Sequence, residues 1–170
     1  MLNCAQLLRD IFFKLIREMS YRIKLRGQSS PDQKSPTVRV LLIAFIGASL
    51  AGASLGLLTE SSQQALIMGS FGASIFLVMA VPDLSFAQPK NVLAGHFLAS
   101  AIGLACFHFI GEGFFIMGIA LGLTTVAMLF FKVAHPPAGS NPIAIFLAGP
   151  DWSFLVTPTL AGAFVIVGLG

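Results

Sequence analysis

The sequence predicts an all-α protein, a polytopic bundle of transmembrane helices. Hydrophobic residues make up 56% of its 170 residues and charged residues only 10%, with a mean hydropathy of +0.88. Soluble domains carry about 25% charged residues. Apolar runs follow one another closely from Val38 to the C-terminus, as in a chain that crosses a bilayer several times. An internal repeat divides these runs into two halves. These three observations favour two three-helix units within one membrane domain.

The first 37 residues are predicted to form a cytoplasmic amphipathic helix and a linker. In residues 1–26, apolar side chains recur at i, i+3 and i+4, with basic ones largely on the other side, as in a helix lying on an anionic membrane surface. Eight of the ten basic residues lie at or before Arg39. The positive-inside rule therefore predicts a cytoplasmic N-terminus in an inner or plasma membrane. A secretory signal is disfavoured because no uninterrupted apolar core with a cleavage site appears.

The membrane domain is expected to span residues 38–170. Hydropathy places helices near 38–58, 64–81, 91–110, 114–133, 137–149 and 154–170. The first, third and fourth segments are long enough to cross a bilayer, which requires about 20 residues. The fifth is short for a crossing and is interpreted as a half-helix.

A sequence repeat accounts for the short helix. A segment starting at Gly69-Ser70 contains Pro-Asp-x-Ser-Phe and then Leu-Ala-Gly-x-Phe, and the same order recurs from Gly139-Ser140 with offsets of 70 to 67. The repeats cover about 38–110 and 114–170. Three helices in each half would make the halves run in opposite directions, the inverted-repeat plan of many transporters. Lys90 and Lys132 then both fall inside the cell.

The stretch from His135 to Pro142 contains three prolines, a glycine and small polar residues between two apolar segments. Because proline removes backbone donors and disfavours helix before it, the preceding helix must end by about His135. Pro136 or Pro137 fits the first turn of the next helix. Short or broken helices are therefore expected near 64–81 and 137–149. A plain cytoplasmic loop before a Pro-Pro helix start is the alternative for this stretch.

Two of these helix starts predict a binding site for a small anion. Unpaired N–H groups and the helix dipole favour an anion at a helix N-terminus, and Ser70, Ser74, Ser140 and Asn141 would add neutral donors. The expected substrate-binding residues are Ser70, Gly72, Ser74, His135, Pro136, Pro137, Gly139, Ser140 and Asn141. Close packing through small residues is the alternative for Gly72, Gly95 and Gly162.

Other polar residues at membrane depth are candidates for the transport pathway. His96 is consistent either with proton coupling or anion contact, or with a packing role, and protonation of His135 could regulate anion entry. Gln88, Lys90 and Asn91 form a polar entry to the third helix. His108 and Trp152 suit the membrane interface, and Asp83 and Asp151 suit turns or helix starts.

No enzyme activity, metal or cofactor is expected. The three histidines lack a carboxylate partner and a His-x-x-x-His spacing, and no phosphate-binding loop is present. Cys4 and Cys106 give no disulfide framework, and the net charge of +3 reports orientation rather than nucleic-acid binding. The expected function is a channel or carrier for a small monovalent inorganic anion. An accessory membrane subunit and a histidine-using membrane enzyme are the alternatives.

At these residues the chain resembles the HPP family of integral membrane proteins. The resemblance rests on His135-Pro136-Pro137-Ala138-Gly139, followed by Asn141-Pro142, and on the earlier segments 72–74, 87–92 and 95–96, and it covers about 38–170. Family members are described as transporters with four spanning helices, and plant chloroplast and cyanobacterial members are linked to nitrite. The resemblance thus implies transport of a small anion; the motif does not name the substrate, and nitrite is the anion expected. Because the membrane part is small for enclosing a pathway, a homo-oligomer is expected.

Overall fold

The computed structural model describes residues 36–62 and 68–170. The surface helix predicted for residues 1–26 and the linker up to residue 35 lie outside these ranges. Contacts divide the chain into a unit of Met1–Pro36 and a unit of Thr37–Gly170. The second unit, here named the membrane unit, contains every element described below.

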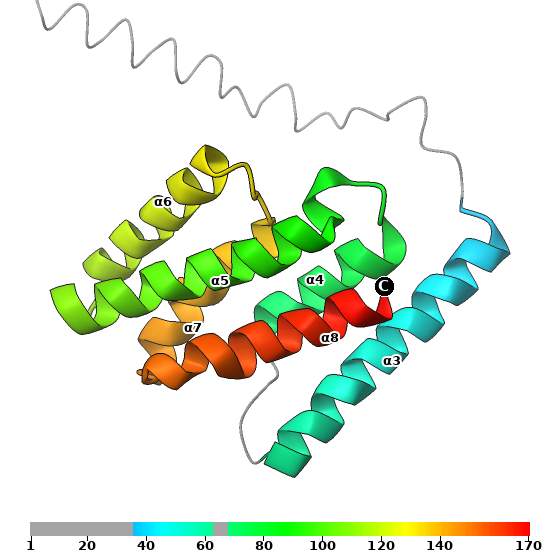
Figure 1. The fold of residues 1–170 in the computed structure, drawn as a ribbon, viewed down its shortest axis with the longest axis horizontal. Coiled ribbons are helices and arrows are strands. Elements are labelled where there is room, and N and C mark those ends of the chain that lie inside the picture. The colour runs from blue at the N-terminus through cyan, green and yellow to red at the C-terminus, as the bar shows by residue number, and fades with distance from the viewer. Residues whose placement is uncertain (1–35, 63–67) are drawn as a thin grey trace, which may run out of the picture. The chain divides into compact units, whose positions relative to one another are not determined.

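The described residues form helices, turns and loops without a strand, which confirms the all-α prediction (Figure 1). The helices are α3 (Val38–Ser62), α4 (Gly69–Ala80), α5 (Pro89–Ala105), α6 (Phe114–Phe130), α7 (Asn141–Ala148) and α8 (Ala161–Leu169). A π-helical turn, Cys106–Ile110, extends α5, and a 3₁₀ turn, Pro136–Ser140, leads into α7. Two further turns, Trp152–Leu155 and Val156–Leu160, lead into α8.

Three stretches in the described part are long and apolar enough to cross a membrane: Val38–Glu60, Pro89–Ile110 and Trp152–Leu169. The first and second of these were expected from hydropathy. The expectation that the segment near 114–133 is also long enough is wrong, because α6 has 17 residues. At 1.5 Å per residue it is about 26 Å long, shorter than the roughly 30 Å hydrocarbon core.

The early end of α6 has a local cause. Lys132 adopts the left-handed conformation, with φ of 55°. The Val133 N–H donates to the Met128 carbonyl at 3.0 Å and the Lys132 N–H to the Leu129 carbonyl at 3.2 Å. This pair of bonds is the Schellman motif that closes a helix. Glycine normally occupies the left-handed position, so the lysine hid the helix end from a reading of the sequence.

The two short helices lie where the sequence predicted short or broken elements. With 12 residues in α4 and 8 in α7, they extend about 18 Å and 12 Å. Pro142 occupies the first turn of α7, where its missing N–H costs no hydrogen bond. The helix ends at Gly149, whose φ of 59° is left-handed. Each half of the membrane unit thus has its shortest helix in the middle, while the inverted relation of the halves stays a prediction.

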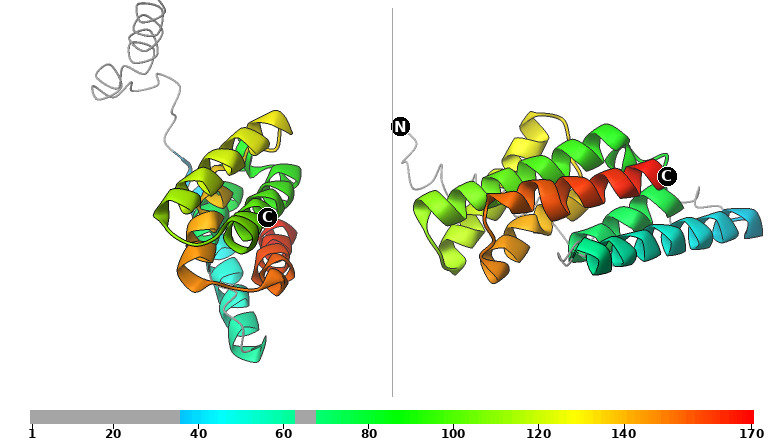
Figure 2. Two further views of the ribbon diagram at one scale, coloured as in Figure 1. Left: turned by 90° about the vertical axis from the view of Figure 1, so that its left-hand side faces the viewer. Right: turned by 60° about the horizontal axis from the view of Figure 1, so that its bottom comes forward.

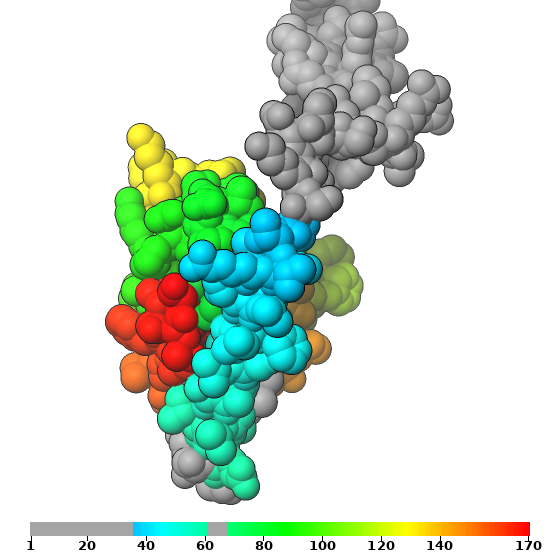
Figure 3. Space-filling model, turned by 90° about the vertical axis from the view of Figure 1, so that its right-hand side faces the viewer, coloured from blue at the N-terminus to red at the C-terminus, as the bar shows by residue number. Residues whose placement is uncertain are grey.

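Helix α5 contacts more of the bundle than any other single helix of the described part, packing against α6, α7 and α8, while α3 packs against α4 and α8 (Figures 1 and 2). Figure 3 shows α3 running across one face of the unit beside the C-terminal helix α8. Most large apolar side chains of α3 are exposed, among them Leu42 and Phe45. Such a face is suited to lipid or to another apolar helix.

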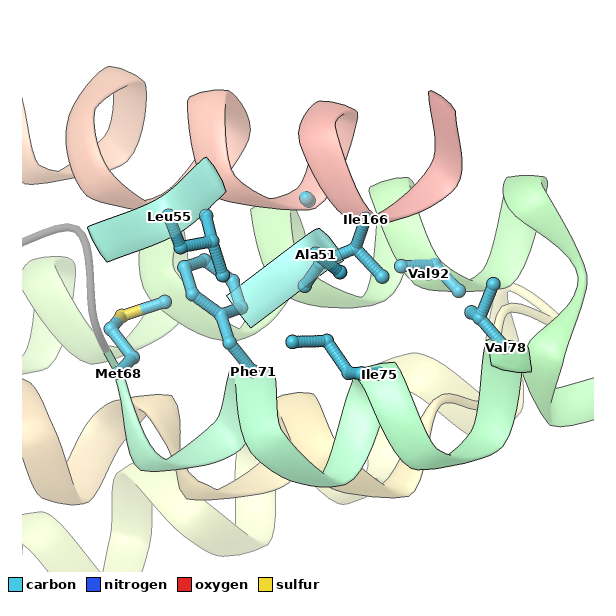
Figure 4. Close-up of a cluster of buried hydrophobic side chains, with 9 residues drawn as sticks. Ala51, Leu55, Met68, Phe71, Ile75, Val78, Val92 and Ile166 are labelled. Atoms are coloured by element: carbon cyan, nitrogen blue, oxygen red, sulfur yellow. The ribbon is translucent and has the colours of Figure 1, made fainter. Parts of the chain in front are cut away.

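The largest hydrophobic core lies between α3, α4, α5 and α8 (Figure 4). It contains Ala51, Leu55, Met68, Phe71, Ile75, Val78, Val92, Ala163 and Ile166. Phe71 is 1% exposed, and a Cβ atom at Gly162 would overlap its ring. The packing role considered for Gly162 is therefore the one that the structure shows.

Candidate functional site

Two of the predicted binding residues line one pocket between the start of α4 and one side of α7. The pocket has a volume of about 220 Å³. Its walls are formed by Met68, Gly69, Ser70, Ser140, Ile143, Ala144 and Leu147. Ser70 and Ser140 are equivalent positions in the sequence repeat. We name this space the serine pocket.

The polar groups of the serine pocket differ in what they offer. Ser70 is 5% exposed, and its Oγ is a buried atom without a hydrogen-bond partner among the described residues. The Ser140 Oγ already donates to the Pro137 carbonyl at 2.9 Å. Within the described residues no side chain caps the start of α4. The Phe71 N–H donates to the Met68 carbonyl at 2.9 Å, while the N–H groups before it lie in the first turn, where intrahelical partners are lacking. The pocket therefore lies at the start of a helix, the positive end of its dipole, with the unpartnered Ser70 hydroxyl buried in its wall.

The other two expected donors, Ser74 and Asn141, are not in the serine pocket. Both are fully buried and belong to a polar network in the interior of the membrane unit. The structure thus corrects the expectation that all four hydroxyl and amide groups meet at one anion site. Ser74 and Asn141 are separated from the serine pocket because both contact His96 of α5. Ser74 lies one turn beyond Ser70 along α4.

At the centre of this network the Ser74 hydroxyl joins two histidines. Its Oγ is 2.8 Å from His96 Nε2 and 2.8 Å from His135 Nε2. The ring centroids of His96 and His135 are 5.0 Å apart, and the Phe71 ring meets His96 edge-on at 5.1 Å. Both histidines have an exposed fraction of 0%. The sequence suggested neither their proximity nor the serine between them.

The outer nitrogen of each imidazole is also bonded. His135 Nδ1 is 2.7 Å from the Phe86 carbonyl, and His96 Nδ1 is 3.1 Å from the Asn141 side-chain amide nitrogen. Asn141 also donates to the Ser100 hydroxyl at 2.9 Å, which is 2.9 Å from Thr159 Oγ1. The Asn141 Oδ1 atom is buried without a partner. One continuous chain of polar contacts therefore extends from the Phe86 carbonyl to Thr159.

Ser100 and Thr159 were missed by the sequence analysis. A signal for Ser100 existed, since it lies four residues after His96 and so on the same face of an otherwise apolar helix. Thr159 had no comparable signal, because it joins the network from the second half of the chain.

The remaining predicted residues lie away from the serine pocket. Gly72 is exposed, with open space where a Cβ would stand. His135, Pro136 and Gly139 border a second pocket of about 220 Å³, to which α6 contributes Thr125, Met128 and Leu129. Pro137, the next residue along the chain, is partly buried. These positions shape the turn before α7 rather than the serine pocket.

The polar residues predicted as an entry to the third helix, Gln88, Lys90 and Asn91, lie at the start of α5. The Gln88 amide donates to the Pro82 carbonyl at 3.4 Å, and the Asn91 amide donates to the Ser85 carbonyl at 2.6 Å. Lys90 is exposed. At the other end of the helix, His108 stacks on Trp152 and its Nε2 is 3.0 Å from the Pro150 carbonyl. Asp151 caps its turn by accepting from the Ser153 N–H at 2.8 Å, as expected.

Within the described residues, no group of three or more His, Cys, Asp or Glu side chains could hold a metal ion. The interior of the described part contains the two histidines but no buried carboxylate, lysine or arginine. The site therefore offers neutral hydrogen-bonding groups and two imidazoles.

Comparisons with known proteins support a membrane protein. A family profile described as "HPP, transmembrane region" matches residues 33–170. A transmembrane protein of Dictyostelium discoideum is 29% identical over 114 residues, covering 62% of this chain and 40% of the relative. A second one from the same organism is 26% identical over 134 residues, covering 74% of this chain and 43% of the relative. The chain thus spans less than half the length of these two relatives.

No solved structure was found to match the chain. The family match covers the whole described membrane unit, including the histidine network and the serine pocket. The chain belongs to the HPP family of integral membrane proteins, matching its transmembrane region.

Proposed function

We propose that this protein transports a small monovalent anion across the membrane, with nitrite as the first substrate to test. The observation that carries the proposal is the serine pocket, which lies between the start of α4, where Ser70 has an unpartnered hydroxyl, and Ser140 with the adjoining side of α7. The transport of small anions that the family resemblance implies agrees with this chemistry.

The pocket's chemistry suits binding that is followed by release. The N-terminal end of a helix carries a partial positive charge, and backbone N–H groups bind anions there. The described residues that line the pocket carry no charge, so among them no lysine or arginine holds the anion tightly and no carboxylate repels it. Met68, Ile143 and Leu147 provide apolar walls, which reduce competition from water and strengthen the remaining electrostatic attraction. Weak binding through neutral donors is what conduction requires.

The volume of the serine pocket is compatible with a small anion. A water molecule occupies about 30 Å³ in the liquid, so about 220 Å³ accommodates a small inorganic anion with a few waters. A large organic anion would not fit without movement of α4 or α7. We therefore expect selectivity for small anions.

The proposal is tested by measuring uptake of nitrite, nitrate and chloride into liposomes that contain only this protein. Protein-free liposomes give the background. Ser70→Ala should lower saturable uptake several-fold, because it removes the unpartnered hydroxyl. Since the Ser70 hydroxyl has no partner, its loss leaves no buried group unsatisfied, and the variant should fold normally.

Ser49→Ala provides a matched control, because Ser49 lies on the exposed face of α3. It should transport like the unmodified protein. Equal uptake by the Ser70→Ala and Ser49→Ala variants would remove the serine pocket from the pathway. No uptake of any anion by folded protein would overturn the transport proposal and favour an accessory subunit.

A further inference from the structure

We propose that His96, Ser74 and His135 form a relay that holds one transferable proton, and that this proton accompanies the anion as its coupling ion. The inference rests on the proposed function for its transport role, but the relay itself follows from the hydrogen-bond geometry alone. The positions of the hydrogens in the relay can be assigned starting from the Phe86 carbonyl.

A carbonyl oxygen only accepts hydrogen bonds. His135 Nδ1 lies 2.7 Å from the Phe86 carbonyl oxygen, so Nδ1 must carry the hydrogen of this bond. The Nε2 atom of a neutral His135 is then an acceptor, and its partner at 2.8 Å is the Ser74 hydroxyl. The Ser74 hydroxyl has one hydrogen and two acceptors within reach, since the Ser70 carbonyl oxygen lies 3.0 Å from its Oγ and His135 Nε2 lies 2.8 Å away. In the neutral network we assign this hydrogen to His135, the shorter contact, because two lone pairs would otherwise face each other at 2.8 Å.

That choice determines the state of His96. With its hydrogen given to His135, Ser74 Oγ can only accept from His96 Nε2, 2.8 Å away. A neutral His96 then has an accepting Nδ1, which faces the Asn141 amide nitrogen at 3.1 Å. In this assignment Asn141 donates to His96, His96 to Ser74, Ser74 to His135, and His135 to the Phe86 carbonyl, while the Ser70 carbonyl is a second, longer acceptor for the Ser74 hydrogen. The two histidines are thus opposite tautomers linked in one direction.

An added proton can reside on either ring, and moving it needs no other reactant. If His135 is the imidazolium, its Nε2–H donates to Ser74 while the Ser74 O–H donates to His96 Nε2. The transfer breaks the His135 N–H and the Ser74 O–H bonds and forms a new Ser74 O–H and a His96 N–H bond. The added positive charge passes to His96, and Ser74 ends as a neutral hydroxyl. A second proton is disfavoured because the two ring centroids are 5.0 Å apart.

Adding a proton changes the hydrogen bond between His96 and Asn141. In both protonated forms His96 Nδ1 carries a hydrogen, so the Asn141 amide must turn to present its oxygen. That oxygen, Oδ1, is buried without a partner in the neutral network. Asn141 is the first residue of α7 and directly follows Ser140 of the serine pocket. The relay therefore contacts the helix whose start lines the anion site.

The relay also reaches the other wall of the pocket. Ser74 Oγ is 3.0 Å from the Ser70 carbonyl, and Ser70 lines the serine pocket. A positive charge on either imidazole would attract an anion bound there, and the anion would favour protonation in return, as linkage requires. One proton moving with one monovalent anion makes the transport electroneutral.

No other titratable group competes for this role in the described part of the interior. The groups in contact with the two imidazoles are the Phe71 ring of α4, the Ser74 hydroxyl, the Asn141 amide of α7 and the Phe86 carbonyl, none of which titrates near neutral pH. The buried Cys106 lies ten residues beyond His96 on α5, about 15 Å along the helix. The two histidines are therefore the titratable groups of the relay, and Ser74 connects them.

The tautomers are tested by nitrogen NMR on histidine-labelled protein, with peaks assigned through His96→Gln, His108→Gln and His135→Gln variants. Near neutral pH, His96 should carry its hydrogen on Nε2 and His135 on Nδ1. The same tautomer at both positions would overturn the relay. This measurement does not depend on transport, so it separates failure of the relay from failure of the proposed function.

Coupling is tested by nitrite-driven proton uptake in liposomes that contain a pH-sensitive dye, with protein-free liposomes as background. The unmodified protein should move one proton per nitrite. Ser74→Ala should lower proton movement per anion at least tenfold, and Ser74→Thr should restore it because the hydroxyl returns.

Each result of the coupling experiment has a defined meaning. Nitrite uptake without proton movement in the unmodified protein would overturn the coupling role while keeping the transporter. Absence of nitrite uptake in folded protein would overturn both the coupling and the proposed function. Full coupling in the Ser74→Ala variant would overturn the part assigned to the hydroxyl.

Discussion

Gly95 of α5 lies directly against His135, so close that a Cβ atom at position 95 would stand 2.7 Å from the His135 Cβ and 3.3 Å from the Val133 carbonyl oxygen. The absence of a side chain at position 95 lets the segment before α7 approach α5. This approach brings His135 within reach of Ser74 and hence of His96. The glycine and the two histidines are therefore one structural unit, although they come from two halves of the chain.

Gly95→Ala should destabilise the folded protein by about 1–3 kcal/mol, because the added methyl group overpacks the contact with His135. Alanine is the better helix former, which offsets up to about 1 kcal/mol of this cost. The control is Gly52→Ala, since nothing lies within 4 Å of a Cβ at that position. Thermal unfolding in detergent should show a lower midpoint for Gly95→Ala alone. Equal midpoints would mean that this contact can relax.

The hydrogen bond between Ser100 and Thr159 should couple the two halves of the chain. Thr159→Val and Ser100→Ala each remove a buried hydroxyl, at a cost of about 1 kcal/mol. The double variant should lose less unfolding free energy than the two single variants added together, because the bond that they share is lost only once. Unfolding free energies of the four proteins give the coupling directly. Strict additivity would contradict a direct bond between these hydroxyls.

Filling the serine pocket should block transport without unfolding the protein. Ala144 is partly buried and lines this pocket, so Ala144→Phe would occupy space that the anion needs. Ala148→Phe, at an exposed position of the same helix, is the matched control. Nitrite uptake should fall at least tenfold for the first variant and stay near normal for the second. Normal uptake by both would place the pathway elsewhere.

The structure also predicts which loops share a side of the membrane. Lys90 lies in the first turn of α5. The Val133 carbonyl, which follows Lys132, lies close to Gly95, so Lys132 is near the same end of α5. The Pro150 carbonyl contacts His108 at the opposite end. The 17 residues of α5, from Pro89 to Ala105, extend about 26 Å, and the π-helical turn that contains His108 continues beyond them. Lys90 and Lys132 should thus face one side, which we propose to be the cytoplasm, and Asp151 the other.

This arrangement is tested with single cysteines at positions 90, 132 and 151, after replacement of Cys4 and Cys106 by alanine. An impermeant maleimide added from one side should label Lys90→Cys and Lys132→Cys together. It should label Asp151→Cys only from the other side. Labelling of all three from the same side would contradict the crossing of α5.

A second copy of the chain is the partner we propose for α6. Gly118 and Gly122 lie four residues apart on this helix, with open space where their Cβ atoms would be. Small residues at this spacing allow close helix association in lipid. Gly122→Leu should shift the protein towards the monomer in crosslinking and mass measurements. Leu123→Phe enlarges an exposed side chain pointing about 100° away and should leave the oligomer intact; equal mass for both variants would exclude this face.

Local sequence patterns predicted much of the fold. The prolines from Pro136 to Pro142 placed the short helix α7, and hydropathy found the long helices α3 and α5. The end of α6 was missed because a lysine takes the left-handed conformation there, and residues 154–170 begin with irregular turns around Thr157, whose φ of −134° is not helical. Such backbone conformations are selected by tertiary contacts, so a local sequence pattern does not predict them.

The candidate site was predicted in part. The repeat indicated that Ser70 and Ser140 are equivalent, and both line the serine pocket. The separation of Ser74 and Asn141 from this pocket could not be foreseen, because it depends on how α4, α5 and α7 are rotated against one another. Ser100, Thr159 and the Phe86 carbonyl joined the network for the same reason.

The sequence by itself determined that this is an all-helical membrane protein, that α4 and α7 are short, and which family it resembles, because hydropathy, proline and short motifs act over a few neighbouring residues. Only the tertiary structure decided that Ser74 joins two histidines lying 22 and 61 residues away along the chain. Such contacts depend on helix packing, which the missing side chain at Gly95 makes possible. In a protein interior, a polar side chain takes whichever partner the packing leaves within hydrogen-bonding distance.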